Sequence, residues 1–103
     1  RQRDAYVIPH VNPAGITGAP AISHTIHDTY INSLGERATL AIDPDFTGVG
    51  FVDFKVSEDG RALPTELNAG RFGTTNHFYT AAGANFPYCL LRLAFDEPLP
   101  EYA

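Results

Sequence analysis

Two kinds of side chain alternate from Val49 to Val56, as they do along a β-strand. Successive side chains of a strand point to opposite faces of a sheet, so each kind belongs to one face. The set that predicts a core-facing side consists of Gly50, Val52, Phe54 and Val56. The opposite set consists of Val49, Phe51, Asp53 and Lys55.

A tight turn at Asp59-Gly60 is predicted to follow this strand, with a returning strand over residues 61–68. An Asp-Gly pair between two strand candidates is the strongest short-range hairpin signal. Two registers are open. If Asp59-Gly60 alone forms the turn, Asp53 lies directly opposite Glu66, and if residues 57–60 are all loop, Asp53 faces Pro64 and lies diagonal to Glu66. In both registers the two carboxylates share one face.

Helical periodicity appears before and after the hairpin. Residues 29–42 repeat their apolar positions at helical spacing, with Asp28 as the N-cap, Gly35 as a weak point and Pro44 as the stop. The apolar face of this helix consists of Ile31, Leu34, Ala38, Ala41 and Ile42. A short helix capped by Thr74 or Thr75 is predicted to end at Gly83, and a second runs over residues 86–95 from an Asn85 cap. The predicted core face of that last helix consists of Leu90, Leu91 and Ala94.

The start of the chain predicts little regular structure. Residues 4–11 read as a strand, residues 12–20 as a Gly- and Pro-rich loop, and residues 22–27 as a short strand. The predicted fold class is therefore α+β, a small antiparallel sheet covered by helices on one face.

Composition narrows the class of protein. The 103 residues, 44% of them hydrophobic, suit one modest core and hence one domain or part of one. A net charge of -5 with only seven Lys and Arg argues against binding to nucleic acid or to an anionic membrane. No apolar run approaches the roughly 18 residues of a spanning helix. The single Cys89, inside an apolar run, predicts a buried structural thiol and suits a cytoplasmic protein.

The hairpin carries the candidate chemistry. Like charges across a strand pair are destabilising, so Asp53 and Glu66 call for a neutralising partner. Asn68 follows on the same face of the returning strand, and these three oxygen donors are of the kind that a hard divalent cation prefers. Arg71 adds a planar donor fork that matches phosphate oxygens, although a structural salt bridge would explain it equally well. The set predicts a magnesium-nucleotide site, and the alternative is a solvated polar face.

These residues carry a family resemblance. The run ELNAGRFGTT (residues 66–75) after the VDF strand resembles the end of the nucleotide-binding region of ATP-grasp enzymes, in particular the carbamoyl-phosphate-synthase large-chain-like branch. The resemblance continues through residues 74–100. It implies that Asp53, Glu66 and Asn68 hold Mg²⁺ or Mn²⁺ and that Asn68 and Arg71 contact ATP, with Arg71 also catalytic. The usual Glu-x-Asn-Pro-Arg pattern is altered, because Ala69-Gly70 replaces the proline and shifts Arg71 by one residue.

The resemblance also has implications for the domain organisation, function and partners of the chain. Residues 1–103 would be the C-terminal portion of an ATP-grasp domain, because the phosphate-covering loop and phosphate-binding lysines of that family lie upstream of the matched part. The function implied is an ATP-dependent carboxylate-amine ligase, inactive as an isolated fragment. Its partners would be ATP, a small carboxylate and the missing upstream part, with a homo-oligomer left open. The alternatives are a non-catalytic nucleotide-binding module and a metal-dependent hydrolase.

Other polar residues are weaker candidates. His24 and His27 are three residues apart, which on a strand places them on opposite faces, so with His10 they make a poor zinc site. His77 is a candidate neighbour of the nucleotide site or a helix-start residue. For Arg1 and Arg3, which the resemblance makes weak candidates for substrate or phosphate contact, solvation at the chain end is the better expectation.

Overall fold

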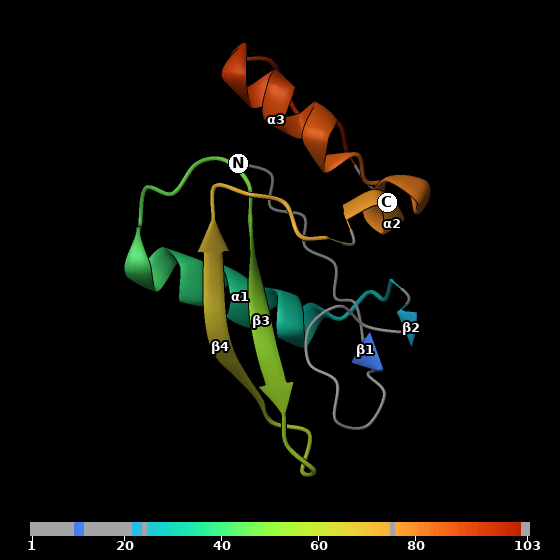
Figure 1. Ribbon diagram of the computed structural model, residues 1–103. Coiled ribbons are helices and arrows are strands. Elements are labelled where there is room, and N and C mark those ends of the chain that lie inside the picture. Colours follow the sequence, from blue (N-terminus) through green and yellow to red (C-terminus); the bar gives the residue numbers. More distant parts are fainter. Residues whose placement is uncertain (1–9, 12–21, 24, 75, 102–103) are drawn as a thin grey trace.

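The computed structural model describes residues 10–11, 22–23, 25–74 and 76–101, and these form an α+β arrangement (Figure 1). The elements, in chain order, are β1 (His10–Val11), β2 (Ile22–Ser23), α1 (Thr29–Ile42), β3 (Gly50–Val56), β4 (Ala62–Ala69), α2 (Asn76–Ala81) and α3 (Phe86–Ala94). The two strand pairs are separate, β1 with β2 and β3 with β4. The predicted α+β class is confirmed.

The β3–β4 hairpin is closed by a loop that differs from both predicted loops. The Ser57 N–H donates to the Arg61 carbonyl (2.9 Å), and the Gly60 N–H donates to the Ser57 carbonyl (2.9 Å). Three residues, Glu58 to Gly60, therefore connect the strands, and Gly60 takes the left-handed conformation at φ +82°. The prediction of a hairpin at Asp59-Gly60 is confirmed, whereas both the two-residue turn and the four-residue loop are wrong.

A β-bulge then sets the register at the centre of the hairpin. Val56 pairs with Ala62 and Phe54 pairs with Pro64, and the register shifts between Asp53 and Phe54. Asp53 consequently lies directly opposite Glu66. The bulge leaves Thr65 as the additional residue of β4, and the Thr65 hydroxyl donates to the Asp53 carbonyl (3.1 Å). The first of the two predicted positions for Asp53 is thus observed, although an extra residue and not the turn produces it.

Helix α1 has the predicted limits and the predicted N-cap. The Asp28 carboxylate accepts hydrogen bonds from the backbone N–H groups of Tyr30 (3.0 Å) and Ile31 (3.1 Å), two of the donors that the first turn leaves without helical partners. The Asp43 N–H donates to the Thr39 carbonyl (3.0 Å) at the other end. Local chemistry therefore fixes both ends of this helix.

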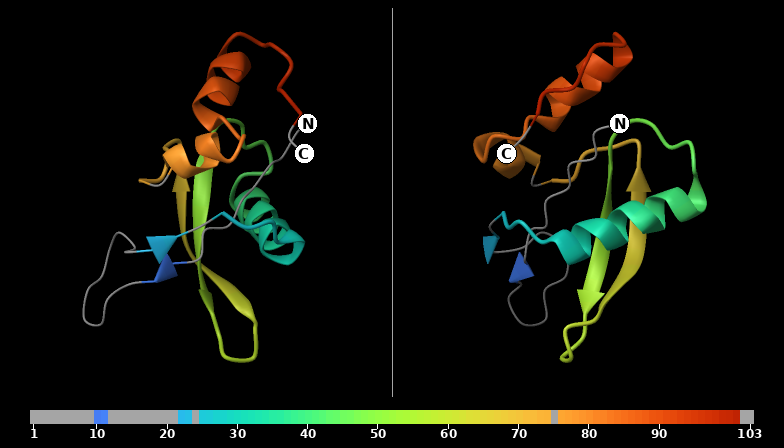
Figure 2. Two further views of the ribbon diagram at one scale, coloured as in Figure 1. Left: turned by 90° about the vertical axis from the view of Figure 1, so that its right-hand side faces the viewer. Right: turned by 180° about the vertical axis from the view of Figure 1, so that it is seen from behind.

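Helix α1 packs on one face of the hairpin (Figure 2). A Cβ atom added to Gly35 would lie 3.6 Å from the Phe54 ring, so the glycine marks the close contact between helix and sheet. Ile31 is buried. Two other residues predicted for this core are open to solvent, since Val56 is 62% and Ile42 is 71% exposed. A single helix does not cover the full extent of the face.

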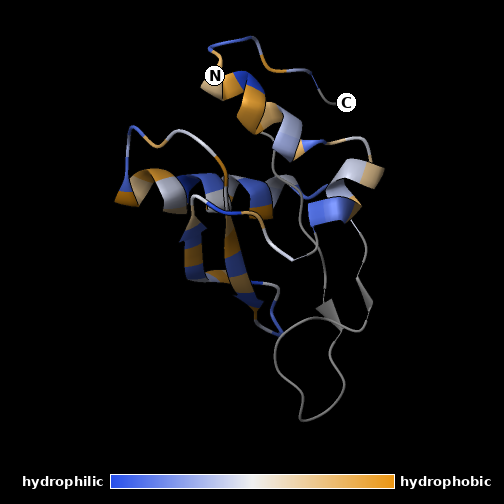
Figure 3. Ribbon diagram, turned by 45° about the horizontal axis from the view of Figure 1, so that its top comes forward, coloured by the Kyte–Doolittle hydropathy of each residue, from blue (hydrophilic) through white to orange (hydrophobic). Residues whose placement is uncertain are grey.

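Helices α2 and α3 pack against each other and not on the hairpin strands. The Asn85 side chain accepts a hydrogen bond from the Tyr88 N–H (3.1 Å), which confirms the predicted cap of α3. The predicted core face of α3 is wrong in part, because Leu91 is 59% exposed while the buried residue is Cys89. Of the helices described, only α1 covers the sheet. Figure 3 shows the alternating hydropathy of the hairpin strands and the apolar character of α3.

The first part of the chain is described only in small pieces. Strands β1 and β2 pair in antiparallel fashion, with His10 opposite Ser23. The predicted loop at residues 12–20 and the candidates Arg1 and Arg3 lie outside the described residues. Among the helices that the structure describes, none has both the length and the apolar character that a membrane span requires.

Candidate functional site

The face of the hairpin opposite α1 gathers the residues that the sequence analysis selected. Its register pairs Asp53 with Glu66 and Phe51 with Asn68. These four residues, together with Arg71, are called the polar face below. Strand alternation places them there, because Val52 and Phe54 point toward α1. The hairpin thus separates its packing residues from its candidate ligand residues.

Asp53 and Glu66 face each other across the two strands as exposed side chains. Directly opposed side chains in an antiparallel pair have Cβ atoms roughly 5 Å apart, and two like charges at that separation are destabilising. Within the described residues, neither carboxylate has an ion pair or accepts a hydrogen bond. Two carboxylates that protein groups leave unsatisfied have the donor chemistry of a divalent-cation site.

Arg71 folds back onto the polar face from the end of β4. Its Nε and Nη2 groups both donate to the Asn68 Oδ1 atom, at 3.2 Å and 2.7 Å. Its guanidinium carbon lies 5.2 Å from the centre of the Phe51 ring, within the range of a cation–π interaction. The guanidinium group is therefore held on one edge by an amide and on one flat side by an aromatic ring.

The backbone turn at Gly70 makes this return possible. Gly70 has φ +75°, a left-handed conformation that residues with a Cβ atom rarely adopt, and its N–H donates to the Val49 carbonyl (2.8 Å). The chain thereby leaves the strand immediately after its last ladder bond. Ala69 and Gly70 are the two residues that stand where the ATP-grasp pattern has one proline, so this turn belongs to the part of the chain that departs from that pattern.

Asn68 is half-buried, and its two amide atoms have different surroundings. Oδ1 accepts both bonds from Arg71. Nδ2 is buried and, among the described residues, has no hydrogen-bond partner. The oxygen expected to bind a cation is therefore already used by Arg71 in this structure, which decides how Asn68 can take part in a site.

Tyr79 on α2 adds a residue that the sequence analysis did not select. Burial raises its pKa, and the negative charge of Asp53 raises it further, to about 12. Its ring packs edge-on against Phe86, with centroids 5.4 Å apart. A helix that follows the hairpin thus brings a tyrosine into the electric field of the polar face. No periodicity in the sequence relates α2 to β3, so the sequence pattern did not indicate that the charge of Asp53 acts on Tyr79.

The two histidines whose side chains the structure describes, His27 and His77, do not belong to a group of metal-ligating side chains. His77 is an exposed residue of α2 whose ring lies 4.2 Å from the ring of Phe78. The side chains of His10 and His24 lie outside what is described. In residues 25–74 and 76–101, no three His, Cys, Asp or Glu side chains are grouped so as to hold a metal ion. The set on the polar face differs in kind, because it combines two carboxylates with an amide.

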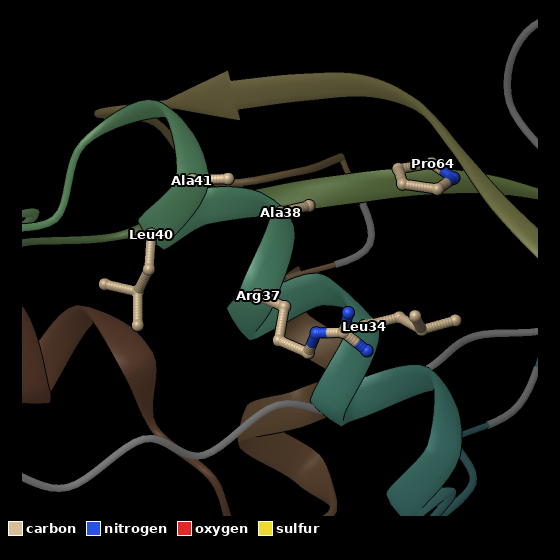
Figure 4. Close-up of a pocket in the computed structure, with 6 residues that line it drawn as sticks. All are labelled: Leu34, Arg37, Ala38, Leu40, Ala41 and Pro64. Carbon is tan, nitrogen blue, oxygen red and sulfur yellow. The ribbon is translucent and has the colours of Figure 1, made fainter.

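An open depression of about 540 Å³ lies on the other side of the hairpin, between α1 and β4 (Figure 4). It is mostly apolar and is lined by Leu34, Arg37, Ala38, Leu40, Ala41 and Pro64. Pro64 pairs with Phe54, so the depression belongs to the α1 side and not to the polar face.

Comparison with protein-family models, with curated proteins and with solved structures gives no match for this chain.

Proposed function

We propose that the polar face supplies the metal and phosphate contacts of an ATP-dependent ligase of the ATP-grasp type. In this proposal Asp53 and Glu66 hold Mg²⁺ or Mn²⁺, and Asn68 and Arg71 complete the site for the phosphates of ATP. The ligase would convert a small carboxylate to an acyl-phosphate and pass the acyl group to an amine. The chain would be the C-terminal part of such an enzyme and would work with an upstream part in the cytoplasm.

The observation that carries the proposal is the direct opposition of Asp53 and Glu66. Two exposed carboxylates placed directly opposite each other at the centre of a hairpin repel each other and so weaken strand pairing. A cation removes that cost, and a guanidinium group held a few residues away provides a contact for the anion that accompanies it. The sequence resemblance at residues 66–75 supports the same assignment.

The proposed reaction has two steps, phosphoryl transfer to the carboxylate and acyl transfer to the amine. A carboxylate oxygen of the substrate attacks the γ-phosphorus of ATP, the bond from that phosphorus to the β–γ bridging oxygen breaks, and ADP leaves. The amine then attacks the acyl carbon and forms the C–N bond, inorganic phosphate leaves with the C–O bond electrons, and the proton lost by the amine passes to the departing phosphate or to solvent. When bound, the cation offsets charge on the phosphate oxygens, which is the main requirement in phosphoryl transfer. Arg71 donates hydrogen bonds to a phosphoryl oxygen. The first step needs no general base, because the attacking carboxylate oxygen is already ionised.

Calorimetric titration of the chain with Mn²⁺, with and without ATP, tests this proposal. Two carboxylates with little other support predict a weak site, with a Kd on the order of 10⁻³ M or somewhat below, and ATP should tighten it. Asp53→Asn and Glu66→Gln should each abolish the Mn²⁺ signal while the chain stays folded.

The matched control is Glu58→Gln. Glu58 is an exposed carboxylate in the connecting loop of the same hairpin, five residues after Asp53 in the sequence. Its substitution changes the net charge by the same amount and should leave Mn²⁺ binding unchanged. Equal losses in all three variants would mean that the chain attracts cations through its overall negative charge, which would contradict a site at Asp53 and Glu66.

A further inference from the structure

Asn68 and Arg71 form a hydrogen-bonded pair within the polar face. The opposed carboxylates of Asp53 and Glu66 are a separate pair. Nε and Nη2 of Arg71 occupy one edge of the guanidinium group and are both directed at Asn68 Oδ1. An amide oxygen has two lone pairs, and both are used by these two N–H groups. A cation at the same oxygen would lie next to a guanidinium group of the same sign. Asn68 therefore serves either Arg71 or the cation.

The edge of Arg71 formed by Nη1 and Nη2 is not occupied by the contact with Asn68, which uses the edge formed by Nε and Nη2. A guanidinium group carries five N–H donors in a fixed plane, and the Asn68 contact uses one from Nε and one from Nη2. In the part of the chain that the structure describes, Nη1 has no hydrogen-bond partner, and Arg71 is exposed. The edge formed by Nη1 and Nη2 thus presents parallel donors, which is the geometry that binds two oxygens of a phosphate or carboxylate.

Three features fix the orientation of that edge. The Phe51 ring lies under the guanidinium plane, and the Asn68 amide sets its rotation within that plane. The left-handed turn at Gly70 brings the backbone back toward the face. Arginine loses less freedom on binding an anion when its plane is already held, so this arrangement prepares the side chain for a ligand.

We infer that Asn68 is a positioning residue for Arg71 and not a cation ligand, and that the Nη1–Nη2 edge of Arg71 is the polyphosphate contact. This inference rests on the proposed function and makes it more specific. The cation is then held by Asp53 and Glu66 alone among these residues. The additional residue at Ala69-Gly70 explains the change of role, because it gives Arg71 the length of chain that it needs to reach Asn68.

Separate titrations with Mn²⁺ and with inorganic tripolyphosphate in the presence of Mn²⁺ test the two roles of Asn68. In Asn68→Ala the Mn²⁺ affinity should stay within about twofold of the wild type, because no ligand is lost. The tripolyphosphate affinity should fall about tenfold, as it should in Arg71→Ala. The double variant should lose no more than either single variant, since the two residues act as one unit.

Lys55→Ala is the charge control for these variants. Lys55 is exposed on the same face of β3 and does not contact Asn68. Its removal should lower tripolyphosphate affinity by less than about threefold, which separates the general loss of positive charge from the loss of an oriented donor.

The side-chain N–H signal of Arg71 provides a readout independent of binding. Nε–H should exchange slowly with water in the wild type because it is hydrogen-bonded, and the signal should persist when Mg²⁺ is added. Asn68→Ala should remove this protection, and Asn68→Asp, which keeps an acceptor oxygen, should restore it. These spectra also establish that each variant is folded.

The outcomes separate this inference from the proposed function. A tenfold loss of Mn²⁺ affinity in Asn68→Ala, or loss of the Arg71 signal on addition of Mg²⁺, would make Asn68 a cation ligand and overturn the inference while the cation site stands. Additive losses in the double variant would also overturn it. Absence of Mn²⁺ binding in the wild type would refute the proposed function, and the positioning role would then be decided by tripolyphosphate binding and the Arg71 signal alone.

Discussion

The two faces of the β3–β4 hairpin are built from the same strands and differ in what covers their side chains. One face packs against α1, and the other carries exposed charged groups. On one face, Val52 and Phe54 are half-buried beneath α1, and Gly35 is the helix residue that faces the Phe54 ring. On the other, Asp53 and Glu66 are exposed and opposed, without ion pairs among the described residues. The first face is covered in part by α1, whereas the second has side chains whose charges call for a ligand. The difference suggests that substitutions on the first face affect folding and those on the second affect binding.

The largest effect should come from the packed side. Ile31→Ala removes most of a buried side chain from α1 and is expected to lower the free energy of unfolding by about 3 kcal/mol, through lost burial and the cavity that remains. Urea denaturation followed by circular dichroism measures this change. If the variant does not fold, Ile31→Val should show a loss of about 1 kcal/mol. A loss no greater than that of a surface substitution would show that α1 does not provide the core.

A smaller loss is expected from the turn that serves the polar face. Gly70→Ala places a Cβ atom at a residue with φ +75°, where it has open space but a strained backbone. The expected loss is about 1–2 kcal/mol. The same variant should weaken tripolyphosphate binding, because the turn carries Arg71. Unchanged stability would indicate that the left-handed turn is not maintained in solution.

Replacement of Gly35 in α1 should have the opposite effect on stability from replacement of Gly70. A Cβ atom at Gly35 would meet the Phe54 ring at 3.6 Å, an ordinary van der Waals contact, and the residue has helical geometry. Gly35→Ala is expected to raise the free energy of unfolding by about 0.5–1 kcal/mol, because alanine loses less backbone entropy in a helix. Urea midpoints for the two glycine variants should therefore move in opposite directions. Destabilisation by Gly35→Ala would mean that helix and sheet approach more closely than this contact.

Removal of one charge from the polar face should stabilise the fold slightly. Asp53→Asn relieves the repulsion from Glu66 and is expected to gain about 0.5 kcal/mol at low ionic strength. Added salt should reduce the gain, because exposed charges are screened. Glu58→Gln corrects for the change in net charge. If the two variants were equally stable, the repulsion between Asp53 and Glu66 would be negligible.

The smallest effect concerns the titration of Tyr79. Its pKa is raised to about 12 by burial and by the charge of Asp53, so its ionisation should follow that of more exposed tyrosines in an absorbance titration near 295 nm. The unfolded chain ionises from about pH 10 upward, so the stability associated with neutral Tyr79 is present below that pH and is lost as the pH rises toward 12. Asp53→Asn should lower the pKa of Tyr79, but only in part, because burial is the larger cause. An unchanged pKa in that variant would place α2 away from the polar face.

The features that could be predicted from the sequence are those governed by local chemistry. The caps Asp28 and Asn85 bond to N–H groups of their own helices, so composition and spacing suffice to identify them. That Asp53 and Glu66 share one face followed from strand alternation, but their direct opposition was one of two open registers and is produced by the bulge.

Other features depend on residues that are distant in the chain or on small backbone changes. The bulge at Thr65 shifts the register by one residue, and no residue pattern specified it. Leu91 lies on the exposed side of α3 while Cys89 is buried, and periodicity alone could not decide which of the apolar residues α3 would bury. The contact of Arg71 with Asn68 required the left-handed turn at Gly70, whose direction the strand pattern does not give.

The most direct test of the cation site is paramagnetic broadening of backbone amide signals by Mn²⁺. Substoichiometric Mn²⁺ should broaden the signals of Asp53, Glu66 and their strand neighbours before those of the loop at Glu58 and Asp59, and Glu66→Gln should remove this selectivity. Uniform broadening of all acidic segments, unaffected by Glu66→Gln, would show that the polar face does not bind a cation and would contradict the proposed site.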